Sequence, residues 1–80
     1  MLVINNKNTK YDYDHDVLHA YFGEENNSSA EEVETGIYIY KDDTSDKIIK
    51  ITFMDFNKRY HSIRAWIEKN NCTISDDFIL

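Results

Sequence analysis

Apolar and polar residues alternate with a period of two in three stretches of the chain. In each stretch one set of alternate positions is consistently apolar, which is typical of an antiparallel strand with one buried face. We expect these apolar positions to form the sheet side of the core, and they are Leu18, Ala20 and Phe22; Ile37 and Ile39; and Ile49, Ile51 and Phe53. Short strands over 2–4 and 32–34 would extend the sheet.

Polar segments separate these strands. Residues 23–30 consist mainly of glutamate, asparagine and serine, which predicts a surface loop. Residues 41–47 contain three aspartates between the second and third strands, which predicts a polar hairpin loop rather than a two-residue turn. Gly36 is expected to break or bulge the second strand, because glycine meets the least steric resistance there.

After residue 55 the apolar period changes to that of a helix. Four apolar residues fall at i, i+4, i+7 and i+11, namely Phe56, Tyr60, Ile63 and Ile67. This spacing predicts a helix over about 58–69 that packs its apolar stripe on the sheet. Asp55 or Asn57 could cap its start, and 70–71 could end it. Residues 73–80 return to an extended character.

Together these elements predict one α+β domain over residues 1–80. Its sheet is antiparallel with three to five strands, and one C-terminal helix packs on one face. The chain is 41% hydrophobic and 14% aromatic, which is typical of a folded protein rather than a disordered one. A chain of this length buries only about 60% of the surface that its unfolded form exposes, so one modest core is expected.

The net charge of −6 is unevenly distributed. Eleven acidic residues and one lysine give residues 12–46 a charge of −10, whereas residues 47–69 carry +4. An acidic surface repels phosphates, so the first region favours a basic protein partner, or simple solubility, over nucleic acid. The basic feature consists of Lys58, Arg59, Arg64 and Lys69, with Tyr60 and Trp66 between them. These bases either contact phosphates or only complement the helix dipole.

The predicted outer face of the sheet is unusually apolar. It carries Val17, His19, Tyr21, Tyr38, Tyr40, Ile48, Thr52 and Met54, with Lys50 among them. A contiguous aromatic patch of this kind usually marks a homodimer or partner site, because tyrosine provides a large contact area at low entropic cost. The alternative is that the apolar segments 78–80 or 2–4 cover this face.

Three stretches have the order and spacing of a known family: YDYDHDVLHAYF at 11–22, EEVETGIYIY at 31–40 and IIKITFMDFNKR at 48–59. They resemble the domain of unknown function 2283, a family of small prokaryotic and phage proteins. Its pattern reads Y-D-x-x-x-D-V-L-Y-I-x-F, then E-V-x-x-G-I-x-V-D-Y-D, then I-V-G-I-E-I-L-D-x-S-K-R. The resemblance implies a compact antiparallel sheet and brings no established activity or catalytic residues.

Two departures from the family pattern stand out. The family usually carries glycine in the hairpin loop where this chain has Ser45 and Asp46, and it often ends near the pair that is Lys58 and Arg59 here. The helix that follows this pair could therefore carry what is particular to this protein. Members tend to be short proteins in mobile or toxin–antitoxin settings, and this association favours an antitoxin-like or anti-defence inhibitor.

Metal and catalytic motifs are incomplete. Asp12, Asp14 and Asp16 have the first ligand spacings of a calcium loop, but Val17 and Gly23 stand where its glycine and glutamate belong. The residues that could ligate zinc lack the paired spacings of zinc modules, and they are His15, His19, His61 and Cys72. We therefore expect no metal, no cofactor and no enzymatic activity.

The leading hypothesis is a small acidic protein-binding module that inhibits a basic partner in the manner of an antitoxin. The predicted contact residues are Tyr21, Tyr38, Tyr40, His19, Asp42 and Asp43. The alternative is a nucleic-acid-binding regulator that acts through the four bases of the helix region. With one cysteine, no apolar run long enough to span a bilayer and no signal segment, the expected location is the cytoplasm.

Overall fold

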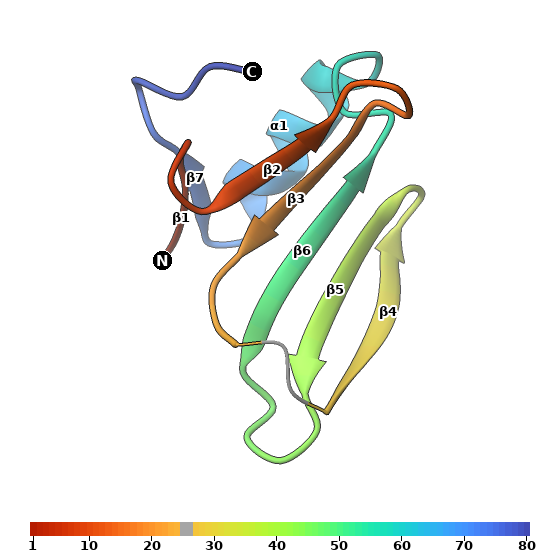
Figure 1. The fold of residues 1–80 in the computed structure, drawn as a ribbon, viewed down its shortest axis with the longest axis vertical. Helices are drawn as coiled ribbons and strands as arrows, with labels where there is room; N and C mark the ends of the chain where they lie inside the picture. Colours follow the sequence, from red (N-terminus) through yellow and green to blue (C-terminus); the bar gives the residue numbers. More distant parts are fainter. Residues whose placement is uncertain (25–26) are drawn as a thin grey trace.

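The centre of the molecule is a five-stranded antiparallel sheet with strand order β2-β3-β6-β5-β4 (Figure 1). The computed structural model describes residues 1–24 and 27–80. The strands of this sheet are β2 (Thr9–Asp12), β3 (Val17–Tyr21), β4 (Ser28–Glu34), β5 (Ile37–Asp42) and β6 (Ile48–Met54). The expectation of an antiparallel sheet with three to five strands is confirmed.

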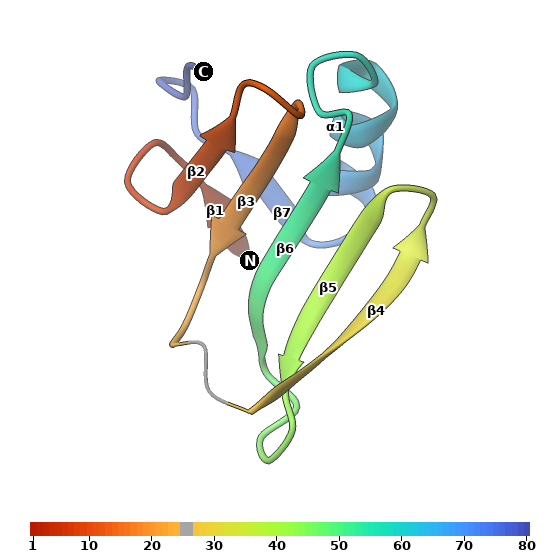
Figure 2. The same cartoon turned by 45° about the vertical axis from the view of Figure 1, so that its right-hand side comes forward.

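One face of this sheet is covered by the helix and by a second, smaller sheet. The helix α1 (Tyr60–Lys69) lies behind β2 and β3 in the view of Figure 1, and Figure 2 shows it beside the end of β6. The smaller sheet pairs β1 (Leu2–Ile4) with β7 (Cys72–Ile74) in parallel, so strands from the beginning and the end of the sequence lie side by side. The α+β class and the single C-terminal helix are therefore confirmed.

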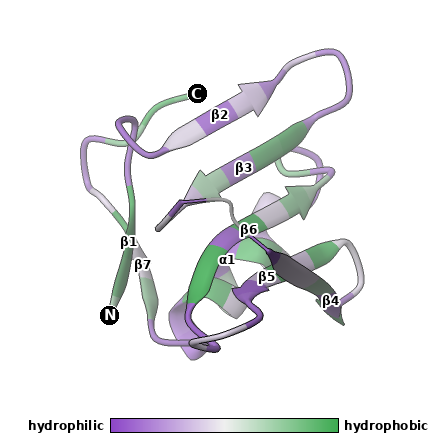
Figure 3. Cartoon of the chain, turned by 60° about the horizontal axis from the view of Figure 1, so that its bottom comes forward, coloured by the Kyte–Doolittle hydropathy of each residue, from purple (hydrophilic) through white to green (hydrophobic). Residues whose placement is uncertain are grey.

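The core lies between these two layers. Its largest fully buried side chains are Phe53, Phe56, Ile4, Leu18, Ile37, Ile51, Ile63 and Ile67. Figure 3 shows the hydrophobic residues concentrated on β3, β5, β6, β1 and β7, with hydrophilic loops at the periphery. The apolar residues at alternate strand positions and at the i, i+4 and i+7 positions of the helix region thus pack together in one cluster.

A β-bulge changes one assignment made from the alternation. The pairing of β5 with β6 shifts between Tyr40 and Lys41, so Tyr40 pairs with Lys50 but Lys41 pairs with Ile48. Ile48 consequently packs against the core cluster, although it was expected on the outer face. Ile49 is buried beside Gly23, outside that cluster, although it was expected in the core. A bulge adds one residue to a strand and so inverts the faces beyond it.

The sheet also contains more strand than the sequence indicated. β2 was not predicted, because the sequence Thr-Lys-Tyr-Asp is short and shows little alternation. β4 begins at Ser28, so the predicted loop over 23–30 is too long by the last three residues. Positions 25–26 of that loop lie outside the described residues. Every residue of β4 after Ser28 is exposed, and no buried set of positions marks it as a strand.

Gly36 lies in the turn between β4 and β5, and the bulge in this hairpin falls instead between Glu32 and Glu34. The backbone at Gly36 has φ 76°, a left-handed conformation that glycine adopts without strain. A Cβ added there would lie 2.9 Å from Nη1 of Arg59, which donates a 2.6 Å hydrogen bond to the carbonyl of Thr35. This glycine therefore allows the turn to dock against the start of the helix.

The helix begins at Tyr60, and its N-cap residue is Arg59, which makes no capping hydrogen bond with its side chain. The expected cap from Asp55 or Asn57 is therefore wrong. Asp55 instead takes a left-handed backbone with φ 51°, and its carbonyl accepts a hydrogen bond from the Arg59 amide at 2.8 Å. The expected helix end at 70–71 is confirmed, because Asn70 is the C-cap residue and the backbone of Asn71 is left-handed with φ 58°. β7 follows directly.

Phe56 offers a test of this core. Its ring is fully buried and lies 5.6–6.4 Å, centroid to centroid, from the rings of Phe53, Tyr60 and Phe78. We expect Phe56→Ala to lower the free energy of unfolding by about 3–5 kcal/mol, measured by urea denaturation. Ile79→Ala is the control, because Ile79 is 73% exposed and its truncation should cost less than about 0.5 kcal/mol. Equal losses in the two variants would contradict the assigned core.

Candidate partner-binding surface

The sheet face opposite α1 carries a set of side chains that no other element of the described chain covers. We call it the open face, and it consists of Val17, His19, Tyr21, Tyr38, Tyr40, Lys50, Thr52 and Met54. The segments that could have covered it lie on the other side. Leu2, Ile4 and Phe78 pack with the core cluster, and Phe78 contacts the ring of Phe56. The alternative that either end of the chain shields this face is therefore wrong.

One row of the open face is built around a lysine. Tyr21 of β3 and Tyr40 of β5 both pair with Lys50 of β6, so the three side chains lie next to one another across three strands. The Lys50 ammonium lies 4.3 Å from the centre of the Tyr40 ring and 5.7 Å from that of Tyr21. Both distances suit a cation–π interaction, which orients the two rings around the lysine.

The next row is held by a hydrogen bond. His19 and Tyr38 both pair with Thr52, and His19 Nδ1 lies 3.0 Å from Thr52 Oγ1. Thr52 is only 5% exposed, so this polar side chain forms the floor between two larger rings. On the far side Glu32 pairs with Tyr38, and its negative charge and hydrogen bond raise the pKa of the Tyr38 hydroxyl.

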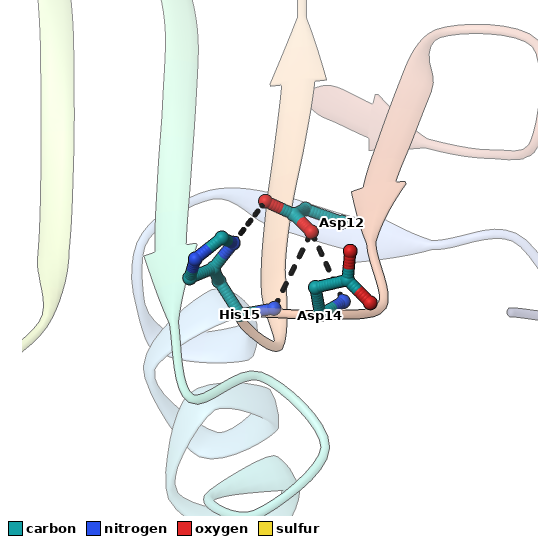
Figure 4. Close-up of polar contacts among 3 residues, drawn as sticks. All are labelled: Asp12, Asp14 and His15. Atoms are coloured by element: carbon teal, nitrogen blue, oxygen red, sulfur yellow. Dashed lines mark hydrogen bonds and ion pairs between the residues drawn. The ribbon is translucent and has the colours of Figure 1, made fainter.

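These residues surround a shallow depression of about 540 Å³, which also reaches Asp12 and His15 at the β2–β3 turn. Figure 4 shows that turn, in which the Asp12 carboxylate points at the His15 ring. Asp12 Oδ2 lies 2.9 Å from His15 Nδ1, and Oδ1 accepts hydrogen bonds from the amides of Asp14 and His15. These hydrogen bonds lower the pKa of the Asp12 carboxyl, and the bond to the His15 side chain has the largest effect. The depression therefore has Thr52 at its floor, aromatic rings at its sides and a carboxylate at its rim.

Of the predicted contact residues, His19, Tyr21, Tyr38 and Tyr40 come together on the open face, whereas Asp42 and Asp43 do not. These two aspartates lie at the end of the β5–β6 hairpin. Asp42 Oδ2 accepts hydrogen bonds from the amide and hydroxyl of Ser45, and Asp43 Oδ1 accepts one from the Ser29 hydroxyl. Both carboxylates thus order the hairpin and its neighbour β4.

The hairpin loop also explains a departure from the family pattern. Asp46, which stands where the family usually has glycine, is left-handed with φ 62°. Aspartate tolerates this conformation better than most residues, and the Asp46 amide donates to the carbonyl of Asp42 at 2.9 Å. The loop therefore keeps the backbone geometry that a glycine would allow.

The four bases of the helix region do not share one face. Arg64 lies five residues from both Arg59 and Lys69, a step that turns a helix by about 140°, whereas Arg59 and Lys69 line one hollow of about 310 Å³. Arg59 is bound to the Thr35 carbonyl, and Arg64 lies 3.3 Å from Glu68 and 3.1 Å from the Tyr60 hydroxyl. Lys58 precedes the helix, with its amide bound to Asp16. Nucleic-acid binding through all four bases stays a prediction, because Lys58 and Arg64 do not line the hollow that Arg59 and Lys69 share.

Asp16 has a role that the sequence reading missed. Its Oδ1 accepts hydrogen bonds from the Tyr11 hydroxyl at 2.6 Å and the Asn57 amide at 2.8 Å, and its Oδ2 accepts one from the Lys58 amide at 3.1 Å. Its carbonyl accepts a further bond from the Phe56 amide at 2.9 Å. The carboxylate thus joins the β2–β3 turn to the segment that leads into α1. The sequence did contain a signal for this role, because Tyr11 and Asp16 are the first and last residues of the motif Y-D-x-x-x-D that this chain shares with the family pattern.

The sequence's candidate metal and nucleophile residues are dispersed. In residues 1–24 and 27–80, no group of three or more His, Cys, Asp or Glu side chains could hold a metal ion. Cys72 is buried in the core, where it donates to the carbonyl of Asn70 at 3.3 Å, and desolvation raises the pKa of its thiol. Within the same residues, no helix has the length and apolar character needed to cross a membrane.

A comparison with family models gives one match. The model of DUF2283, described as a protein of unknown function, matches residues 8–57, which is more than half of the chain. The match covers β2 to β6 and ends before α1, so the helix and the β1–β7 sheet lie outside it. No curated protein and no solved structure matches the chain.

The Asp16 contacts predict an acid-sensitive stability. Hydrogen bonds from Tyr11 above all, and from the Asn57 and Lys58 amides, lower the pKa of Asp16 below the ordinary 3.8, and the same contact raises the pKa of Tyr11 to about 12. A carboxylate with a lowered folded-state pKa stabilises the fold above its unfolded pKa, and this stabilisation is lost as the pH falls through the folded value. We therefore expect Asp16→Asn to be less stable than the wild type at neutral pH.

The difference should disappear under acid conditions, because the wild-type carboxyl is then neutral as well. Denaturant unfolding of both proteins from neutral pH to below the ordinary value of 3.8 measures this convergence. Asparagine keeps the size and the tolerance for the left-handed backbone at this position, where φ is 54°. Asp14→Asn is the control, since no hydrogen bond to its carboxylate joins distant segments. A stability difference that does not change with pH would rule out the charge of Asp16 as the cause.

Proposed function

The chain belongs to the DUF2283 family of proteins of unknown function, and within that family we propose that it is a small non-enzymatic binding module. It engages a basic surface of a protein partner through the open face, and it acts as an inhibitor in the manner of an antitoxin or an anti-defence protein. The observation that carries this proposal is an aromatic sheet face that no other element of the described chain covers.

The chemistry of the open face suits a protein partner. Tyr21, Tyr38 and Tyr40 are each half-buried, so each presents part of its ring to the surroundings while its position is set by neighbouring strands. Rigid tyrosines lose little conformational entropy on binding and provide both apolar area and a hydroxyl. A flat sheet also holds these rings in fixed register, so little reorganisation is required before contact.

The charge around the open face determines the kind of partner. Residues 12–46, which carry a net charge of −10, supply β3, β4, β5 and the β2–β3 turn. Asp12 lines the depression, and Glu32 of the neighbouring strand pairs with Tyr38. Such a field accelerates encounter with a positively charged surface and opposes encounter with a second copy. A basic protein is therefore favoured over a homodimer through this face.

Affinity capture from the native cell lysate, with and without nuclease, tests the proposal. A basic protein recovered in stoichiometric amount after nuclease treatment supports it. Nuclease-sensitive recovery of nucleic acid would instead support the bases around Lys58 and Arg64. With the captured partner purified, the association rate should fall between low and high salt, because screening weakens electrostatic steering. An association rate independent of salt would contradict the charge argument.

The double variant Tyr38→Ala/Tyr40→Ala tests the surface itself. We expect its affinity for the partner to fall by about 30-fold, equivalent to about 2 kcal/mol, because central aromatic residues dominate binding energy at interfaces. Tyr38→Phe/Tyr40→Phe is the matched variant and should retain most of the affinity, since it keeps both rings. Ile79→Ala, on the tail at the other side of the sheet, should bind normally. Unaltered affinity in the alanine variant would place the contact elsewhere.

A further inference from the structure

The edge strand β4 has a free hydrogen-bonding side. It pairs with β5 along Ser28–Glu34, and no strand of the described chain lies on its other side (Figure 1). The bulge between Glu32 and Glu34 interrupts the regular pattern near its end, which leaves 28–32 as a regular segment. All of these residues except Ser28 are exposed, and Ser28 is half-buried. β4 is therefore an accessible template for a further strand.

The ladder identifies which amides are free. The Asp43 amide donates to the Asn27 carbonyl at 3.0 Å, one residue before β4 begins. Hydrogen-bonded and non-hydrogen-bonded pairs alternate along an antiparallel ladder, so Ser29 and Glu31 bond to β5. The backbone groups of Ser28, Ala30 and Glu32 consequently point away from the sheet. These are the groups that an added strand would bond.

The side chains around this edge determine what can bind there. On the helix side of the sheet, β4 and the hairpin line a hollow of about 410 Å³. Its apolar lining comes mainly from Val33 and Ile39, and its polar lining is rich in carboxylates, with Glu31, Asp42, Asp43 and Asp46 against one lysine, Lys41. Val33 is 39% exposed. An occupant with apolar side chains over the floor and cationic side chains at the rim fits both features.

We propose that β4 binds an extended lysine- or arginine-rich segment of a partner protein by strand addition. The backbone of that segment bonds to Ser28, Ala30 and Glu32, and its alternate side chains enter the acidic hollow. Strand addition of this kind gives affinity through the main chain and specificity through alternate side chains. The inference rests on the basic partner of the proposed function, but its main-chain contacts lie along the outer edge of β4 and not on the aromatic rings of the open face, so each can fail without the other.

A second copy of the chain is a poor occupant of this edge. An antiparallel pairing of β4 with itself would add the three glutamates of a second copy, and no cationic side chain, to an edge that already carries Glu31, Glu32 and Glu34. Like charges directly opposite or diagonal across strands destabilise the pair, whereas lysine or arginine at those places stabilises it. The charge of the strand thus selects against self-association and for a basic segment.

The test uses a short peptide of alternating lysine and valine and the full chain in solution. Amide hydrogen exchange measured by NMR should show that the peptide protects the amides of Ser28, Ala30 and Glu32. A peptide of alternating glutamate and valine should give no protection. Binding of the lysine peptide without protection of these amides would overturn strand addition and leave only charge attraction. Absence of binding would overturn the whole inference.

Two variants separate the contributions of charge and backbone. Glu31→Gln/Glu32→Gln should weaken peptide binding about tenfold, because it removes two opposite-charge pairs. Asp14→Asn/Asp76→Asn changes the net charge equally at sites away from β4 and should bind as the wild type does. Ala30→Pro removes one outward-facing amide and should abolish protection while the fold, monitored by the NMR spectrum, is kept. Normal peptide protection in Ala30→Pro would contradict the assigned edge, and Tyr38→Ala/Tyr40→Ala should bind the peptide normally.

Discussion

The Asp16 carboxylate is the interaction on which the arrangement of this fold depends. Its oxygens accept hydrogen bonds from the Tyr11 hydroxyl in the same hairpin and from the amides of Asn57 and Lys58, which lie more than forty residues away in the chain. The left-handed backbone of Asp16 turns the chain from β2 into β3, and that of Asp55 turns it out of β6. One side chain therefore fixes both corners and directs α1 to one face of the sheet.

The open face is a consequence of that arrangement. The helix, the β1–β7 sheet and the C-terminal Phe78 all pack on the same side, where Phe53 and Phe56 form the centre of the core. Among residues 1–24 and 27–80, no further element covers the opposite side. Its tyrosines are accordingly stabilised by neighbours within the sheet, such as Lys50 and Thr52, rather than by a second layer.

Much of this could be read from the sequence, because period-two and helical spacing depend on local geometry. Ile51, Phe53 and Ile63 were correctly assigned to the core, and the grouping of Tyr38 and Tyr40 on the outer face followed from the same alternation. The faces of Ile48 and Ile49 were exchanged, because a bulge depends on pairing with another strand. β2 was missed because it is short and shows little alternation. The Asp16 contacts were missed because the amides of Asn57 and Lys58 lie far away in the chain.

The parallel pairing of β1 with β7 has a consequence for the order of folding. Leu2 pairs with Cys72 and Ile4 with Ile74, and Ile4 and Cys72 are both buried in the core. Each pair joins residues 70 positions apart in the sequence, and closing so long a loop is slow. The hairpins of the larger sheet close much shorter loops and therefore form first. Until β7 arrives, the apolar side chains of β1 lack their partner strand.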